Sequence, residues 1–127
     1  MDNFREFEAG PDPFGRTWHV WFKYLQTAIS IRHSDSVDVC FILESGEERC
    51  EKTVVIPNAD IRAYAKRTGR PVNDAWCSRI AMCKISLAIE TAEDIEKFYL
   101  PVTAREIEDF DGAIKKWEQD WAKKHAA

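Results

Sequence analysis

The chain has 127 residues, of which 45% are hydrophobic and 12% aromatic, and its formal net charge is −4 at neutral pH. This length and composition are enough to bury one core without disulfides, so we expect a single folded domain and exclude disorder for most of the chain. The negative charge disfavours nucleic acid as the main partner, and the absence of an apolar run of ~20 residues argues against a membrane-spanning helix.

The N-terminal sequence and the four cysteines favour a cytoplasmic protein. No basic start followed by an apolar stretch is present, so no secretory signal is predicted. No Cys-x-x-Cys or Cys/His ligand spacing occurs, and we predict reduced thiols, no metal and no cofactor. A hairpin turning at Ser45-Gly46 would place Cys40 opposite Glu51, so that Cys40 and Cys50 point to opposite faces and form no disulfide.

The N-terminal half predicts an arm followed by a β-meander. Residues 1–15 mix phenylalanine with proline and glycine, which predicts an irregular arm, and residues 16–127 follow as one α+β domain. Between residues 16 and 56, three segments rich in aromatic and β-branched residues are separated by short turns. They predict a three-stranded antiparallel meander. The first segment is longer than a usual strand, so we expect a bulge or bend within it.

The C-terminal half predicts three or four helices packed on one face of this meander. Helices are expected over residues 59–67 and 74–90, and the second is apolar around most of its circumference, as in a central buried helix. A short helix is expected after Thr91. Thr103 and Glu106 form a capping box that predicts a final helix from about residue 104 to Lys124.

Two apolar surfaces predict a homodimer. If Ala28 pairs with Phe41, both faces of the meander carry apolar residues, and the helices can cover only one of them. The final helix also carries an apolar seam, which predicts docking onto the body or pairing with the same helix of a second subunit. Exposed apolar patches mark contacts. The predicted interface residues are Leu25, Ile29, Ile31, Ile42, Trp117 and Trp121.

The first strand combines charged and aromatic residues that predict a ligand pocket. Arg16, His19, Trp21 and Tyr24 would line a pocket between this strand and the buried helix, with Arg16 binding an anion and His19 transferring a proton. Strict alternation opposes this, because it places His19 and Trp21 on one face and Arg16 and Tyr24 on the other. A partly buried histidine within an aromatic core is therefore the competing interpretation.

A basic segment follows the meander. Arg62, Lys66 and Arg70 could bind an anion or a nucleic-acid backbone. The next segment is acidic, so the competing interpretation is that the two segments complement each other within or between subunits. The triad residue types in His33-Ser34-Asp35-Ser36 are neighbours in one turn, where they cannot converge as a hydrolytic triad must.

No catalytic constellation emerges from the sequence. We therefore predict a non-enzymatic binding or interaction domain that self-associates. The first alternative is a small-ligand-binding protein or minor enzyme that uses the pocket on the first strand. The second alternative is an anion or nucleic-acid binder that uses the basic helix face.

Overall fold

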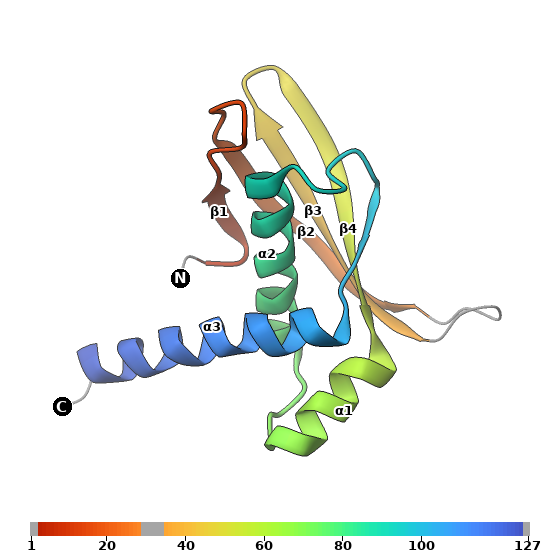
Figure 1. The fold of residues 1–127 in the computed structure, drawn as a ribbon, viewed down its shortest axis with the longest axis vertical. Helices are drawn as coiled ribbons and strands as arrows, with labels where there is room; N and C mark the ends of the chain where they lie inside the picture. The colour runs from red at the N-terminus through yellow and green to blue at the C-terminus, as the bar shows by residue number, and fades with distance from the viewer. Residues whose placement is uncertain (1–2, 29–34, 126–127) are drawn as a thin grey trace.

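The computed structural model describes residues 3–28 and 35–125, which form a mixed α+β fold with a five-stranded sheet and three helices (Figure 1). The elements in chain order are β1 (Glu6–Ala9), β2 (Trp18–Ala28), β3 (Ser36–Ser45), β4 (Glu48–Pro57), α1 (Asn58–Thr68), α2 (Asp74–Thr91), β5 (Tyr99–Pro101) and α3 (Ala104–Lys124). The predicted meander corresponds to β2, β3 and β4.

The sheet extends the predicted meander by one short strand at each edge. Its order is β1-β2-β3-β4-β5, with antiparallel pairs up to β4 and a parallel pair between β4 and β5. β1 arises from the arm that was predicted to be irregular, where Phe7 and Ala9 are buried while Glu6 and Glu8 are exposed. This alternation is the pattern of a half-buried strand.

The short helix expected after Thr91 does not form. Residues 92–98 instead form turns that lead into β5. The hydroxyl of Thr91 donates to the carbonyl of Leu87 at 2.8 Å and accepts from the amide of Glu93 at 3.2 Å, so it closes the end of α2. A helix of a few residues makes too few hydrogen bonds to offset the cost of nucleation.

Alternate strand residues and the helices enclose one core. α2 lies across one face of the sheet, and α3 packs against both α1 and α2 near the end of β4 (Figure 1). The predicted capping box at the start of α3 is present, formed by Thr103 and Glu106. Fully buried core residues include Val20, Val39, Phe41, Leu43, Val54, Ile56, Ile80, Ile85, Leu100, Ile107 and Ile114.

A bulge in β2 changes which residues face the helices. The pairing of β2 with β3 shifts between Phe22 and Tyr24, so Leu25 pairs with Val39 and packs against the core. The prediction that Leu25 lies on the uncovered face was therefore wrong. Ala28 pairs with Ser36 rather than Phe41. Ile29 and Ile31, the other β2-side interface candidates, lie outside the described residues.

The second hairpin differs from its predicted register by two residues. Ser45 pairs with Glu48, so Cys40 lies opposite Thr53 rather than Glu51. Because successive strand residues alternate between faces, a slip of two leaves each side chain on its predicted face. Cys40 and Cys50 accordingly point to opposite sides of the sheet, and both are free thiols.

The buried carboxylate of Asp111 joins the three helices. Asp111 lies on α3 and is 0% exposed. It accepts from the Tyr64 hydroxyl of α1 at 2.6 Å, from the Trp76 indole of α2 at 2.8 Å, and from Nε and Nη2 of Arg70 at 3.0 and 2.8 Å. Arg70 follows α1 and also donates to both carboxylate oxygens of Glu118. The buried charge is thereby fully compensated.

These contacts also set the ionisation of Asp111 and Tyr64. Burial alone would raise the pKa of Asp111, but hydrogen bonds from Tyr64, Trp76 and Arg70 outweigh it and hold this pKa below the ordinary 3.8. Burial and the hydrogen bond to Asp111 raise the pKa of Tyr64 to about 12. Around neutral pH, a protonated phenol therefore donates to an ionised carboxylate, which is the stronger kind of hydrogen bond.

Replacing Asp111 with alanine should lower the free energy of unfolding by about 3–5 kcal/mol, because Arg70, Tyr64 and Trp76 would lose a shared acceptor. Urea denaturation at neutral pH measures the change. Asp109→Ala, on the exposed side of the same helix, is the matched control and should change it by less than about 0.5 kcal/mol. A loss below about 1 kcal/mol for Asp111→Ala would contradict the anchoring role.

The Asp111 contacts should also make the free energy of unfolding depend on pH in the acidic range. The pKa of Asp111 is lower in the folded state than in the unfolded state. Its carboxylate therefore stabilises the fold at pH values above the unfolded-state pKa, and this stabilisation is lost as the pH falls through the folded-state pKa. The stability difference between the wild type and Asp111→Asn should therefore be largest at neutral pH and shrink below about pH 4. Urea titrations at several pH values measure it, and a difference that stays constant down to pH 2.5 would rule out this linkage.

Candidate functional site

The bulge in β2 brings three of the four predicted pocket residues to one face. His19, Trp21 and Tyr24 all lie on the sheet face opposite the helices, which we call the open face. Nε2 of the His19 ring donates to a carboxylate oxygen of Glu6 at 2.9 Å, and the ring packs edge-on against Trp21. Strict alternation had separated Tyr24 from the other two, so the bulge accounts for the difference.

Arg16 does not join them. It precedes β2, stacks on the ring of Trp18 and forms ion pairs with Asp12 at 3.3 Å and Glu48 at 2.7 Å. The cavity between this part of β2 and α2 measures about 50 Å³. Ligand pockets usually measure roughly 300–1,000 Å³, so this space does not suit an organic ligand.

The basic residues predicted to bind an anion have separate roles. Arg70 is bound by Asp111 and Glu118, which leaves it no role in anion binding. Arg62 lies on the exposed surface of α1 and donates to Asn58 at 3.0 Å, and Lys66 is exposed on the same helix. Only two of the three predicted residues are thus available to an external anion.

The open face is mixed rather than apolar. Ile42 lies there beside Trp21, but acids from β1, β3 and β4 share this surface, and Lys23 pairs with Glu51 at 2.6 Å. The sequence-based expectation of a second apolar sheet face was therefore wrong for the strands that the structure describes. This face does not by itself require a partner.

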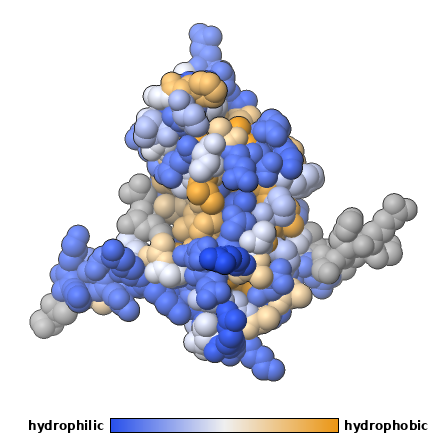
Figure 2. Space-filling model, viewed as in Figure 1, coloured by the Kyte–Doolittle hydropathy of each residue, from blue (hydrophilic) through white to orange (hydrophobic). Residues whose placement is uncertain are grey.

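One apolar surface that remains uncovered lies on α3. The helix packs against the body through its first half, where Ile107 and Ile114 are buried, and its second half extends past α1 and α2 (Figure 1). Its seam continues there with Trp117, which is half-buried, and Trp121, which is 53% exposed. In the view of Figure 2 the projecting end of α3 is otherwise mainly hydrophilic.

A groove of about 400 Å³ opens where α3 leaves the body, lined by Arg79, Trp117, Glu118 and Trp121. The Arg79 guanidinium, from α2, lies over the Trp117 ring at 5.0 Å and over the Phe4 ring at 5.7 Å. Glu118 is neutralised by Arg70. The groove therefore presents two indoles, which the sequence predicted as interface residues, and one stacked cation, Arg79, which it did not single out.

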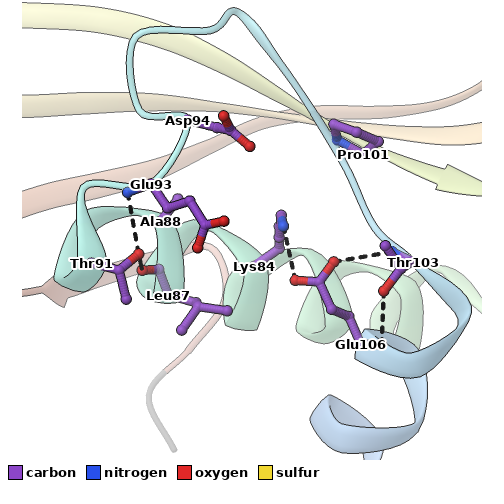
Figure 3. Close-up of a pocket in the computed structure, with 9 residues that line it drawn as sticks. All are labelled: Lys84, Leu87, Ala88, Thr91, Glu93, Asp94, Pro101, Thr103 and Glu106. Atoms are coloured by element: carbon purple, nitrogen blue, oxygen red, sulfur yellow. Dashed lines mark hydrogen bonds and ion pairs between the residues drawn. The ribbon is translucent and has the colours of Figure 1, made fainter.

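A second cavity, of about 350 Å³, lies between the end of α2, the loop before β5 and the start of α3 (Figure 3). Its polar centre is an ion pair between Lys84 of α2 and Glu106 of α3 at 2.8 Å, and both side chains are mostly buried. Glu106 also accepts from the Thr103 amide at 3.1 Å. Glu93 and Asp94 extend from the loop toward the space above α2 (Figure 3).

Two residues of the loop beside this cavity have a left-handed backbone conformation. Ala92 and Asp94 have φ angles of 56° and 58°. The left-handed region costs an alanine roughly 1 kcal/mol or more, and such conformations gather at functional sites. The rest of the chain must hold this loop in place, which it does through the packing of β5 against β4.

Comparisons with protein families, curated proteins and solved structures gave no match, so function has to be argued from this geometry. No helix in the described part of the chain has the length and hydropathy needed to cross a membrane. Among residues 3–28 and 35–125, no three His, Cys, Asp or Glu side chains gather as a metal site would require.

Proposed function

We propose that the protein is a non-enzymatic interaction domain that forms a homodimer through the groove between α2 and the projecting half of α3. The observation that carries this proposal is the continuation of the α3 seam past the body. Ile107 and Ile114 bury its first half, while Trp117 and Trp121 repeat the same spacing where no part of the described chain covers them fully.

The composition of the groove supports a protein partner. Tryptophan and arginine are the residues most enriched at interface positions that dominate binding energy. Burying the exposed part of Trp121 would contribute about 2–3 kcal/mol per copy, before the entropy cost of association. The four cysteines are free thiols, and on this basis we propose a cytoplasmic location.

A second copy of the chain suits the groove because the exposed element is itself a helix. A seam with apolar residues spaced three and four apart packs along another helix. Two projecting halves that pair about a two-fold axis would cover the same tryptophans in both copies, and such isologous contacts are the commonest in homo-oligomers. The same surface of each copy then forms both sides of the interface.

Trp121→Ala should weaken self-association at least about tenfold, because this indole is an exposed anchor of the groove. Sedimentation velocity from about 1 to 100 μM measures the dissociation constant, a range that brackets a moderate dimer affinity. Tyr99→Ala is the matched control, since Tyr99 is 60% exposed but lies on the open face. A wild-type monomer throughout this range, or an equal loss in Tyr99→Ala, would reject the proposal.

A second candidate function is the binding of a small polar ligand in the cavity of Figure 3. Its volume of about 350 Å³ lies within the usual range for ligand pockets, and a mostly buried ion pair faces it. The site differs from the predicted pocket on β2, because it is lined by α2, the loop before β5 and the start of α3 and by no residue of β2. It is compatible with dimerisation through α3.

If this cavity binds a ligand, a screen of small amines, carboxylates and amino acids should find a compound that raises the melting temperature of the wild type. The rise should be lost in Lys84→Met, which removes the cation of the cavity, and kept in Lys116→Met, an exposed lysine on α3. Equal shifts in both variants would place the ligand elsewhere, and no shift with any compound would count against this function.

A further inference from the structure

The cavity between α2, the loop before β5 and the start of α3 contains a lysine whose hydrogen-bonding capacity is only partly used. The ammonium of Lys84 donates to Oε2 of Glu106 at 2.8 Å, and the Lys84 side chain is only 16% exposed. An ammonium carries three N–H donors. Within residues 3–28 and 35–125 no other acceptor binds Lys84. Its remaining donors are therefore available to an acceptor on a ligand in the cavity.

Glu93 is the unmatched acid of the same cavity. Its side chain extends from the loop after α2 in the direction of Lys84 (Figure 3). Of the other two acids that line the cavity, Glu106 is bound by Lys84. Asp94 pairs with Lys97 at 3.1 Å. In the described part of the chain no donor binds the carboxylate of Glu93, so this charge too is available to a ligand.

The two available charges have opposite signs and select the chemistry of the ligand. Lys84 and Glu93 line one cavity without forming an ion pair with each other. A metal ion does not suit the site, because no three His, Cys, Asp or Glu side chains converge among the residues that the structure describes. A simple anion would leave Glu93 unmatched, and a simple cation would leave the donors of Lys84 unused. A zwitterion satisfies both through charge-assisted hydrogen bonds.

We propose that this cavity binds a free α-amino acid with an aliphatic side chain. The carboxylate of the ligand accepts from Lys84, and its ammonium donates to Glu93. Leu87, Ala88 and Pro101 supply an apolar wall for the side chain, and the volume of about 350 Å³ accommodates a molecule of this size. The inference rests on the second candidate function, ligand binding in this cavity, and names the class of ligand.

Three probes with one carbon skeleton separate the two charges. L-Leucine carries both charges, L-leucinamide keeps only the ammonium, and N-acetyl-L-leucine keeps only the carboxylate. NMR titrations of isotope-labelled protein measure each dissociation constant and locate the site through the amide signals of residues 84–94 and 103–106. L-Leucine should bind at least about tenfold more tightly than either analogue, because each analogue loses one charge-assisted contact.

Glu93→Gln tests whether Glu93 binds the ammonium. This change should raise the dissociation constant of L-leucine at least about tenfold and leave that of N-acetyl-L-leucine unchanged, because the acetylated probe has no ammonium. Glu96→Gln is the matched control, since Glu96 is an exposed acid on the same loop that does not line the cavity. It should change neither dissociation constant. A merely structural role of Glu93 would weaken the binding of both probes alike.

The outcomes separate the class of ligand from the function of the cavity. If L-leucine binds no more tightly than its analogues, or if Glu93→Gln leaves its affinity unchanged, the amino-acid ligand is overturned. Ligand binding in the cavity still stands after that result if a small amine or carboxylate shifts the same amide signals. If no compound of any of these classes shifts them, both the ligand class and the function of the cavity are rejected.

Discussion

The fold depends on how one buried negative charge is compensated. Asp111 has no access to water, and the donors that satisfy it come from α1, from the residue after α1's C-cap, and from α2. An uncompensated carboxylate at this position would cost several kcal/mol, so the three helices can adopt only the arrangement that brings these donors together. This contact fixes the first half of α3, and it thereby determines where the second half projects and which of its residues remain uncovered.

The charges of the helices consequently divide into two kinds. Arg70 and Glu118 complete the Asp111 network and hold the structure together. Arg79 has no such partner within the described residues, and its guanidinium lies over the Trp117 ring at the α2–α3 boundary. A charge that is stacked on aromatic rings but unmatched is ready to bind something outside the chain. The proposed dimer rests on the uncovered tryptophans of α3 rather than on the sheet, whose open face is polar enough to meet water.

The sequence predicted the parts of the fold that local patterns determine. The helices at 58–68, 74–91 and 104–124 lie within one or two residues of their predicted bounds, because periodicity and capping signals are local. β1 and β5 were missed because strands of four and three residues exist only through pairing with their neighbours. The expected bulge in β2 was present, but the sequence did not predict its position between Phe22 and Tyr24. Leu25 was therefore assigned to the wrong face of the sheet. The Asp111 network could not be assigned, since Arg70 and Arg79 look alike until the helices are packed.

The central claim is that the projecting half of α3 is the surface that a second copy covers. Hydrogen–deuterium exchange at low and high protein concentration tests it without any substitution. Self-association through this surface should slow the exchange of amides in residues 115–124 at high concentration and leave β2, β3 and β4 unchanged. Identical exchange at both concentrations, or slowing confined to the open face of the sheet, would contradict the account.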